Sequence, residues 1–410
     1  MFYLARQGVN GPESRRSGAQ ALLDFDPFDA AVVADPYPWY ARLREEAPLY
    51  HVARRGYWVL TRYADVREAF RDHQTYSSAR GNSPEPGFQP GLIATDPPKH
   101  TRLRRIVQAV FTRRAIEEAW GARIRAICEE LIRPLLDGAP FDAFRSLTLP
   151  LPVQVIVEML GIPDGDLAQF KRWSDLMVEG VSQHLDAEVE RRTAESFKAL
   201  NDYFHAKVRE RRTGLGADLI TRVAQAGEGE ALTDKEAAHF CILLLIAGNE
   251  TTTNLLGNAL LALMANPAEL VKLRARREEL LPGAVEEMLR FGPPSKCFFR
   301  ETTRPIELHG QTIPANARVM LTIAAGNRDP RVFAEPDRFL VDRVCDNDHL
   351  SFGSGIHHCL GSMLARLETL TFFDVLLARA RDLVPAGEAR IVQNPIVRGP
   401  DRLPMRLVAA

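Results

Sequence analysis

The sequence has little of what would assign a protein to a class at first sight. Its five cysteines, an odd number spread over 410 residues, indicate neither a disulfide framework nor a zinc knuckle, and we expect reduced thiols in the cytoplasm. The formal net charge of -1 gives no reason to expect nucleic acid or an acidic membrane surface as a partner. The most apolar stretch, residues 242–247, is too short to span a bilayer, so we expect a soluble chain without a membrane contact.

Internal repeats, low-complexity linkers and a phosphate-binding glycine-rich fingerprint are also missing from the sequence. Residues 1–22 mix arginine, glycine and serine without a long apolar run. That composition excludes a secretory signal or a membrane anchor and indicates a loose N-terminal lead-in. Because no linker interrupts the remainder, residues 23–410 are expected to form a single large domain.

Apolar residues recur at helical spacing along most of the chain. Strand-like alternation is short and confined to a few places. The sequence therefore predicts a mainly α fold with small β-sheets, one β portion near the N-terminus and another in the C-terminal third. The predicted helical ranges are 102–111, 119–136, 152–160, 194–212, 233–265, 281–290 and 361–380, and the predicted strands are 57–61, 298–302, 306–308, 318–323 and 404–408.

One of these predicted helices, residues 233–265, stands out by its length. Thr233 and Glu236 form a capping box that satisfies free amides at its start, and Asn266 and Pro267 end it. At 1.5 Å per residue the helix is on the order of 45 Å long. It is apolar around most of its circumference. We therefore expect a buried helix that crosses the centre of one domain.

Residues 351–361, Ser-Phe-Gly-Ser-Gly-Ile-His-His-Cys-Leu-Gly, carry the most chemical information. Two close glycines allow the backbone to turn sharply and to pass near a flat cofactor. Cys359 is expected at the start of a helix that runs from Leu360, where free N–H groups and the helix dipole favour a thiolate. One alternative is that Cys359 is a small buried apolar residue. Another is a zinc ligand beside His357 and His358, although adjacent ligands cannot wrap a tetrahedral ion.

The full spacing Phe-Gly-x-Gly-x-His-x-Cys-x-Gly resembles the haem-binding loop of the cytochrome P450 family, and the resemblance extends over residues 35–407. It implies the cytochrome P450 fold, in which haem b (iron protoporphyrin IX) lies between the long central, distal helix and the proximal helix after the cysteine. By this resemblance, Cys359 binds the haem iron as a thiolate and Phe352 contacts the haem. Such a thiolate pushes electron density onto the iron and favours cleavage of the O–O bond.

The segment Ala247-Gly248-Asn249-Glu250-Thr251-Thr252 in the long helix resembles the oxygen-activation motif of the same family. Glycine in a helix costs about 1 kcal/mol relative to alanine, so Gly248 suggests a close approach to the backbone. The Thr251 hydroxyl can bond back to the carbonyl of Ala247 and open the helix locally. The resemblance implies that Glu250, where the family more often has aspartate, relays protons and that Thr251 receives them. The alternative is a Thr/Glu pair that only decorates a helix.

A pair of charged residues resembles the structural triad of the family. Glu287 and Arg290 stand at i,i+3 spacing on one helix face and can form an ion pair. As a lone motif this pair is uninformative, because such pairs are common on surfaces. With Arg338, from the segment Pro-Asp-Arg-Phe at residues 336–339, it matches the Glu-x-x-Arg plus Arg pattern. We expect a role in folding and loop positioning rather than in catalysis.

A further set of side chains matches the haem-propionate ligands of the family. His100 and Arg104, four residues apart after a pair of prolines, lie on one helix face. By resemblance, Arg300 and His357 complete the set. A buried dianionic edge needs such compensation, because unpaired buried charges are costly. The alternative is an ordinary basic helix.

The resemblance also places a substrate pocket. It implies contacts from the loop at residues 76–92, from the distal helix, from residues 295–299 and from a turn near the C-terminus. Lys296 is unusual in such a lining, since it can either meet a carboxylate or point to solvent, and we expect solvent. The expected pocket is mostly apolar, and its residues are Leu243, Ile246, Ala247, Ser295, Phe298, Ile396 and Val397.

Together these motifs imply a haem-thiolate monooxygenase. It would reduce dioxygen with two electrons, supply protons through Glu250 and Thr251, and insert one oxygen atom into a small, largely apolar organic substrate, by hydroxylation or by O- or N-dealkylation. Within the same fold the alternatives are a peroxygenase and an oxidative coupling enzyme, against which the acid–alcohol pair argues. Outside it, the alternative is a non-catalytic haem sensor or ligand-binding protein, although no signalling module accompanies the haem domain.

Electrons must then come from other proteins, because the chain leaves no room for a fused flavin reductase. The resemblance to the soluble bacterial branch implies a ferredoxin and an NAD(P)H-dependent ferredoxin reductase as partners of a cytoplasmic monomer. A docking face for an acidic partner is expected beside the thiolate loop. Each of its arginines could equally be solvated surface. They are Arg102, Arg105, Arg113 and Arg114.

Overall fold

The computed structural model describes residues 24–84, 91–162, 187–214, 218–225, 232–344 and 348–409, with the single positions 169, 172, 173 and 216. Three features of the sequence lie outside the described residues: the lead-in expected at residues 1–22, residues 85–90 of the expected substrate loop, and Cys345. The domain boundary expected after residue 22 therefore stays a prediction.

Helices form most of the described chain, as the apolar periodicity predicts. All seven predicted helical ranges fall on helices of the structure. Apart from the ten-residue helix on which the predicted range 102–111 falls, the sequence analysis missed the helices of ten residues or fewer, because they are too short for apolar residues to repeat over several turns. The helices are α1 (Ala30–Ala34), α2 (Tyr37–Glu46), α3 (Tyr63–Arg71), α4 (Lys99–Gln108), α5 (Arg113–Ile132), α6 (Pro150–Leu160), α8 (Ala187–Arg212), α9 (Leu219–Gln225), α10 (Asp234–Ala265), α11 (Pro267–Ala275), α12 (Arg277–Phe291), α13 (Ile323–Gly326) and α14 (Ser362–Arg379).

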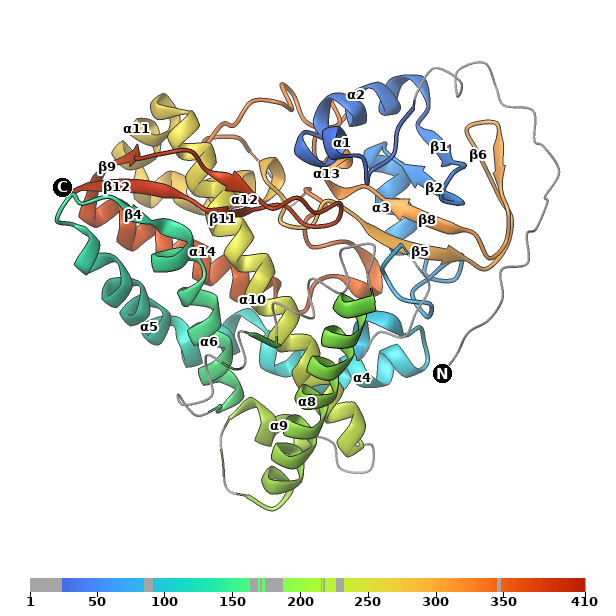
Figure 1. The fold of residues 1–410 in the computed structure, drawn as a ribbon, viewed down its shortest axis with the longest axis horizontal. Coiled ribbons are helices and arrows are strands. Elements are labelled where there is room, and N and C mark those ends of the chain that lie inside the picture. The colour runs from blue at the N-terminus through green and yellow to red at the C-terminus, as the bar shows by residue number, and fades with distance from the viewer. Residues whose placement is uncertain are drawn as a thin grey trace.

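The strands form one larger sheet and several small ones. In the larger sheet the order is β1-β2-β8-β5-β3, with β2 parallel to β8 and the other pairs antiparallel. The predicted strands 57–61, 298–302 and 318–323, from both β portions, therefore meet in one sheet (Figure 1), whereas the predicted strands 306–308 and 404–408 lie in two separate small sheets. The strands are β1 (Leu49–Val52), β2 (Tyr57–Leu60), β3 (Tyr76–Ser77), β4 (Phe141–Asp142), β5 (Phe298–Thr302), β6 (Ile306–Leu308), β7 (Gln311–Ile313), β8 (Arg318–Leu321), β9 (Ala380–Pro385), β10 (Arg390–Ile391), β11 (Pro400–Arg402) and β12 (Pro404–Ala409).

The long helix α10 runs through the middle of the molecule (Figure 1). Its capping box is present: the Thr233 hydroxyl accepts from the Glu236 N–H at 3.2 Å, and the Glu236 carboxylate accepts from the Thr233 N–H at 3.0 Å. Its 32 residues span about 48 Å. Among the described residues, α10 alone is long and apolar enough to cross a membrane, but most of that stretch is buried inside the protein. It is therefore a core helix.

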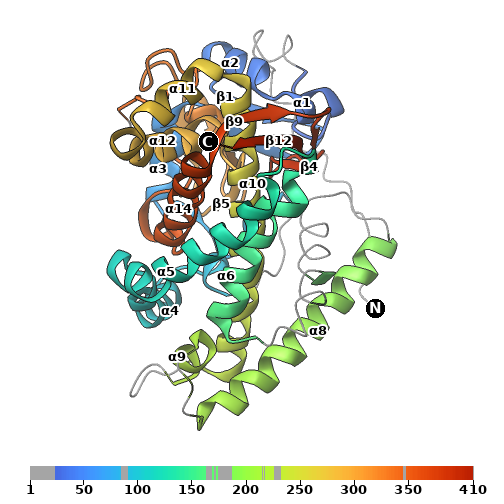
Figure 2. The same cartoon turned by 90° about the vertical axis from the view of Figure 1, so that its left-hand side faces the viewer.

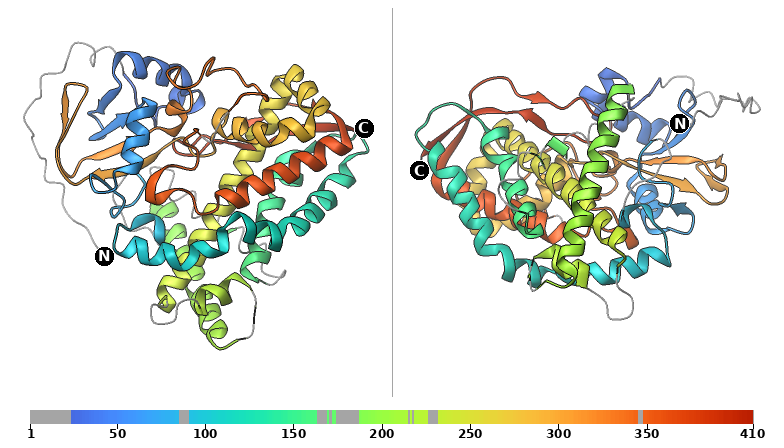
Figure 3. Two further views of the ribbon diagram at one scale, coloured as in Figure 1. Left: turned by 180° about the vertical axis from the view of Figure 1, so that it is seen from behind. Right: turned by 60° about the horizontal axis from the view of Figure 1, so that its bottom comes forward.

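Three other helices pack around α10. Figure 2 shows α8 crossing its N-terminal end, where Arg212 pairs with Asp234 at 3.0 Å. Figure 3 shows α14 lying beside α5, and α14 also packs against α10. The helices α10 and α14 thus form two faces of the same core, which is the arrangement that the sequence predicts for the distal and proximal helices.

Glu368 on α14 is an ionisable residue inside this core. Its side chain is buried and its Oε2 atom has no hydrogen-bond partner. Burial raises the pKa of this carboxyl group from 4.5 to about 8. On the facing helix α5, burial first and Glu368 second raise the pKa of the Cys128 thiol to about 12. Glu368 is therefore neutral in the folded protein near neutral pH.

We expect Glu368→Gln to remove a pH dependence of stability. The pKa of Glu368 is higher in the folded protein than in the unfolded chain. Below pH 4.5 the group is protonated in both states and does not lower the stability; between pH 4.5 and about 8 it ionises only on unfolding, so the free energy of unfolding falls as the pH rises. Between these pH values the free energy of unfolding of the variant should rise relative to that of the wild type by up to about 1.4 kcal/mol per pH unit. Urea unfolding at a series of pH values measures this. Exposed Glu278→Gln is the control, and parallel curves for wild type and Glu368→Gln would refute the expectation.

Candidate functional site

The loop before α14 has a backbone that only glycine allows at two positions. Gly353 and Gly355 have φ values of 67° and 71°. A Cβ atom on Gly355 would also lie 2.8 Å from the carbonyl oxygen of Phe70 and 2.9 Å from the Cα atom of Arg71, so a side chain does not fit there. The N–H of Cys359 donates to the Phe352 carbonyl at 2.8 Å. The loop is thereby closed tightly against α3, with Cys359 at its end.

The Cys359 side chain is exposed, unlike those of Cys128, Cys241 and Cys297. The helix α14 begins at Ser362 and not at Leu360 as predicted, because a turn intervenes and Gly361 takes the N-cap position. Surrounding protein raises the pKa of the Cys359 thiol through desolvation, whereas the Gly361 N–H and two nearby arginines lower it. A bound cation would be needed to make the thiolate the dominant form.

Two histidines near the loop, buried His100 and half-buried His357, each have one ring nitrogen without a hydrogen-bond partner. The ring centroids of His100 and His357 are 4.3 Å apart, and both Nε2 atoms are buried without a partner. Burial first and then Arg104 lower the pKa of His100 to about 4. Burial first and then Arg300 lower the pKa of His357 further. The pair is neutral and can donate to a group that is not protein.

Two arginines complete this cluster. Arg300 on β5 is buried, and burial lowers its pKa to about 10. Burial also lowers the pKa of Arg104, and Cys359 opposes that shift. The carboxylate of Asp96, which acts on both Arg300 and His100, accepts from the Ser77 hydroxyl at 2.5 Å and from the Ser78 N–H at 3.0 Å. The cluster therefore carries an excess of positive charge and of donors around the thiol, which suits an anionic partner.

A second charged network, which the sequence analysis missed, lies below the loop. Arg366 on α14 makes two bonds to Glu286, at 2.7 Å and 2.8 Å, and His349 Nε2 lies 2.9 Å from the same carboxylate. Burial alone would raise the pKa of Glu286, but Arg366 and His349 lower it to about 2. The Arg366 guanidinium lies 4.4 Å from the centroid of the Phe352 ring. The network therefore holds Arg366 in place against the ring of Phe352.

The Glu-x-x-Arg triad is present with a different third member. Arg290 binds Glu287 at 2.6 Å and 2.8 Å, and both side chains are fully buried. The third arginine is Arg343, whose Nε lies 3.0 Å from Glu287 Oε2. The prediction of Arg338 was wrong: its side chain is exposed and pairs with Glu335, and only its carbonyl accepts from Arg290. Arg338 and Arg343 are only five residues apart, and the turn between them decides which of the two side chains reaches Glu287. The sequence alone does not predict the conformation of that turn.

One face of α10 is open near the middle of the helix, where the neighbouring positions are mostly buried. Ala247 is exposed, and Leu243, Ile246, Glu250 and Thr251 are partly exposed at helical spacing from it. The Thr251 hydroxyl donates to the Ala247 carbonyl at 2.6 Å, which is the predicted hydrogen bond. The helix continues without a break through this point, so the predicted local opening stays a prediction.

No neighbouring protein atom requires glycine at position 248. A Cβ atom at this position would meet only the side chain of Ile156, at an ordinary 3.5 Å. The close approach that the sequence analysis expects here would therefore have to come from a bound molecule.

The predicted pocket residues outside α10 separate into two groups. Ser295 forms a β-bridge with Val397, and the Lys296 N–H donates to the Ile396 carbonyl at 2.6 Å, so these segments lie side by side. Phe298 instead packs on the cluster that contains Phe70 and Leu321.

The expectation that Lys296 points to solvent was wrong. Its side chain is 2 % exposed, and burial lowers its pKa to about 8. Ile396 covers its backbone from a segment 100 residues further along the chain, a contact that sequence could not reveal.

The expected docking face also changes. Arg102 forms an ion pair with Glu236 at the start of α10 and does not belong to the face of the thiolate loop. Arg113 and Arg114 are exposed and pair with Glu117 and Glu118 one turn later on α5.

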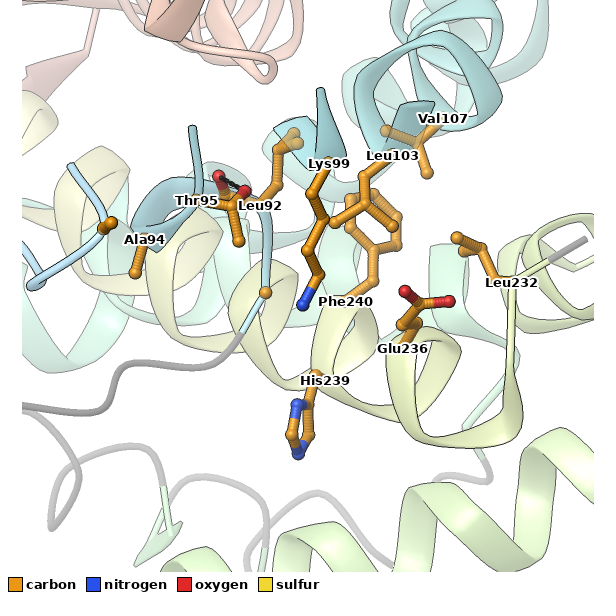
Figure 4. A pocket seen from close by; sticks show the side chains of 12 residues that line it. Leu92, Ala94, Thr95, Lys99, Leu103, Val107, Leu232, Glu236, His239 and Phe240 are labelled. Carbon is orange, nitrogen blue, oxygen red and sulfur yellow. Dashed lines mark hydrogen bonds between the residues drawn. The ribbon is translucent and has the colours of Figure 1, made fainter. Parts of the chain in front are cut away.

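A separate cavity lies between α4, residues 91–95 and the first turns of α10 (Figure 4). Its walls are mainly apolar, and three ionisable residues, Lys99, Glu236 and His239, also line it. The sequence analysis did not find this cavity, because its walls come from segments far apart in the chain.

Comparison with known proteins agrees with this architecture. The family model "Cytochrome P450" matches residues 39–401, so the chain belongs to the cytochrome P450 family. It is a haem protein of the monooxygenase type, an oxidoreductase that incorporates one oxygen atom, and its cofactor is haem b.

Several bacterial proteins are similar over nearly the whole chain. The cytochrome P450 monooxygenase PikC of Streptomyces venezuelae is 36% identical over 402 residues, 94% of each chain. The vitamin D(3) 25-hydroxylase of Pseudonocardia autotrophica is 38% identical over 397 residues, 93% of this chain and 96% of that protein. The structure of CYP109E1 from Bacillus megaterium in complex with testosterone has a TM-score of 0.85 at 34% identity and covers 92% of this chain and 99% of the other.

The residues present fit the haem group. The exposed thiol of Cys359 is the one cysteine among the described residues that an iron ion can reach. The unpartnered Nε2 atoms of His100 and His357, with Arg104 and Arg300, match the two carboxylates at one edge of the group. Glycine at positions 353 and 355 allows the left-handed turns that hold the loop against α3 and leave Cys359 exposed at its end.

Proposed function

We propose that this protein hydroxylates a C–H bond of a largely apolar organic molecule, with Cys359 as the thiolate ligand of the haem iron. The observation that carries the proposal is the exposed Cys359 thiol beside a cluster of donors and cations whose positive charge Asp96 offsets only in part. The cluster consists of His100, Arg104, Arg300 and His357. Hydroxylases among the relatives support this form of the reaction. The Arg366 guanidinium packs on the ring of Phe352, and Phe352 would contact the haem when it is bound.

The haem, when bound, supplies the site at which dioxygen is reduced and cleaved. The chain's own residues then have separate tasks. His100, Arg104, Arg300 and His357 hold the propionates and fix the orientation of the group. The open face of α10 orients the substrate and excludes water, through Leu243, Ile246 and Ala247. Ser295, Phe298, Ile396 and Val397 are proposed to complete the pocket.

Glu250 and Thr251 are proposed to deliver the protons. The reaction consumes one dioxygen, two electrons and two protons, and yields the hydroxylated substrate and water. The Thr251 hydroxyl donates to the Ala247 carbonyl, so its oxygen is free to accept a proton donor from the open side of α10. Glu250, one residue earlier and partly exposed, can pass protons from solvent to that point.

Isotopically labelled dioxygen tests the proposal. The haem-loaded protein, supplied with a ferredoxin, its reductase and NADH, is screened for compounds that displace iron-bound water by their optical shift. Each binding compound is then turned over under labelled dioxygen. We expect one labelled atom in the product. A product without label, or turnover driven by hydrogen peroxide alone, would contradict the proposal and favour a peroxygenase.

Thr251→Ala is expected to uncouple electron use from product formation. Loss of the hydroxyl removes the last proton donor of the relay, so most reduced oxygen should leave as hydrogen peroxide. A positioned proton donor typically contributes about a hundredfold or more to a rate. The measurement is the ratio of product to NADH consumed, with Thr251→Ser as the matched variant that keeps the hydroxyl. Equal coupling in Thr251→Ala and wild type would exclude Thr251 from the relay.

The proposed electron donor is a ferredoxin that is reduced by an NAD(P)H-dependent reductase, and the proposed setting is a monomer in the cytoplasm. The proposed docking face consists of Arg105, Arg113 and Arg114 beside the proximal loop, without Arg102. Ferredoxins are acidic, so attraction to this face would raise the association rate at low salt.

Arg105→Glu is expected to slow reduction by ferredoxin about tenfold at low salt and to flatten its salt dependence, because rim charges act mainly on the association rate. Stopped-flow reduction at several salt concentrations measures both effects. Arg145→Glu, at an exposed position on another element, is the matched charge reversal. If both variants behave alike, Arg105 is not part of a docking face.

A further inference from the structure

One side chain of α10, that of Asn258, joins two segments from distant parts of the chain. Its Nδ2 atom donates to the Gly292 carbonyl at 3.1 Å and to the Arg398 carbonyl at 2.9 Å. Carbonyl oxygens only accept, so both N–H groups of the amide are in use. The residue is 9 % exposed. Asn258 therefore holds both segments against the helix at a place that water hardly reaches.

The two segments also bind each other. The Arg398 N–H donates to the Pro294 carbonyl at 2.9 Å, next to the β-bridge of Ser295 with Val397. The side-chain oxygen of Asn394 accepts from the Val397 N–H at 3.0 Å and closes the turn before the bridge. Residues 292–296 and 394–398 thus form one wall, and Ser295 and Val397 in it are proposed pocket residues.

The wall and the strand that follows it lie very close to α10, where glycines leave room for them. Figure 1 shows β11, which begins at Pro400, beside this helix. A Cβ atom on Gly257 of α10 would lie 2.6 Å from the Cγ atom of Pro400, and one on Gly292 would lie 3.0 Å from the Cβ atom of Asn258. A glycine in a helix costs about 1 kcal/mol relative to alanine, which close packing of this kind offsets. The position of the wall against the helix is therefore narrowly defined.

Asn258 lies two turns after Thr251 on the same face of α10. The two residues are seven positions apart, which corresponds to about 10.5 Å along the helix. The helix that carries Thr251 and the wall that carries Ser295 and Val397 border the proposed pocket from two directions. Because Asn258 connects them, it fixes the distance between them. A misplacement of about 1 Å at such a distance from the chemistry can cost about a hundredfold in rate.

We propose that Asn258 is a specificity-determining residue that acts by position: it holds residues 292–296 and 394–398 against α10 and so sets the width of the pocket beside Thr251. Asn258 does not touch the reacting atoms, and its effect passes through the two segments. The inference rests on the proposed function, because that function assigns the pocket to this wall.

The test compares two ligands of the haem iron on the haem-loaded protein, titrated by their optical shift. Imidazole can bind the iron without reaching the wall, whereas 4-phenylimidazole carries a ring that extends into the pocket. Asn258→Leu keeps a side chain of similar volume but leaves two buried carbonyls without donors. We expect its affinity for 4-phenylimidazole to fall about tenfold, a difference of about 1.4 kcal/mol, and its affinity for imidazole to stay unchanged. Hydrogen exchange at the Lys296 and Arg398 amides should become faster.

Two further variants separate position from stability. Asn266→Leu removes a side-chain amide that donates to the Ala262 carbonyl at 2.8 Å on the same helix, away from the wall. It should keep the wild-type ratio of the two affinities. Gly399→Ala disturbs the wall from its other side, because the new Cβ atom would lie 2.0 Å from the Oδ1 atom of Asn254. It should lower the affinity for 4-phenylimidazole and replaces Asn258→Leu if that variant does not retain haem.

Each outcome has a distinct meaning. An unchanged ratio of affinities in Asn258→Leu, or in Gly399→Ala where it is the replacement, would overturn the inference. An equal change in Asn266→Leu would reflect a general loss of stability and would also overturn it. A changed ratio with faster exchange, in a protein whose products carry no labelled oxygen, would support the role of Asn258 while refuting the proposed function. Labelled product with a wild-type ratio in Asn258→Leu would do the reverse.

Discussion

Cys359→Ser is expected to abolish the red-shifted absorption band of the reduced, carbon-monoxide-bound protein, together with substrate turnover. Thiolate ligation is what produces that band and the electron donation that favours O–O cleavage. A serine hydroxyl keeps the size of the side chain but is a much poorer donor to iron. The loop itself should persist, because its closure depends on the Cys359 N–H and the Phe352 carbonyl, which the substitution leaves in place.

The comparison needs a second cysteine variant. Cys297→Ala removes a buried thiol whose pKa is raised to about 12 by burial, and it should keep the band. Absorption spectra of the reduced protein with and without carbon monoxide measure all three proteins. A wild type without the band, or a Cys359→Ser variant that retains it, would refute the assignment of Cys359 as the ligand.

Glu287→Gln is expected to destabilise the fold by about 3–5 kcal/mol, since it removes one partner of a buried ion pair. Arg290 is fully buried and Arg343 nearly so, and both depend on this carboxylate for compensation. The Leu340 N–H also donates to Glu287 at 2.9 Å. We therefore expect a large loss of stability and of retained haem, measured by urea unfolding and by the haem content of the purified protein.

Arg338→Gln provides the matched control for this prediction. Its side chain is exposed and pairs with Glu335, and exposed pairs of this kind are worth roughly 0–1 kcal/mol. The difference between the two variants also tests which arginine completes the triad. A loss of stability in Arg338→Gln as large as that in Glu287→Gln would restore the assignment that the sequence suggested and contradict the structure.

The parts of the site that could be predicted are those that depend on residues close in sequence. The capping box of α10, the bond from Thr251 to Ala247 and the pair of Glu287 with Arg290 all join residues three or four apart on a helix. Helical geometry alone brings such residues together. The long helices were predictable for the same reason, because their apolar residues repeat over several turns.

The parts that could not be predicted join distant segments. Lys296 is buried because residue 396 lies beside it. Arg102 does not contribute to the proposed docking face because its side chain forms an ion pair with Glu236. Arg366, Glu286 and His349 come from three elements, and nothing in the spacing of these residues indicates that they meet. Such contacts follow from tertiary packing, which local patterns do not encode.

The contact of Gly355 with α3 ties the last third of the chain to the first. The Tyr63 hydroxyl donates to the Asp348 carbonyl at 2.6 Å, and the Tyr63 N–H donates to Asp329 at 3.0 Å, on the same side of the loop. During synthesis, nearly 300 further residues must therefore be added after α3 before the loop against which it packs has been made. An N-terminal fragment that ends before residue 351 has no ligand loop, and a C-terminal fragment has the loop without the surface that shapes it. Haem capture is thus a property of the completed chain, so haem retention reports on folding as a whole.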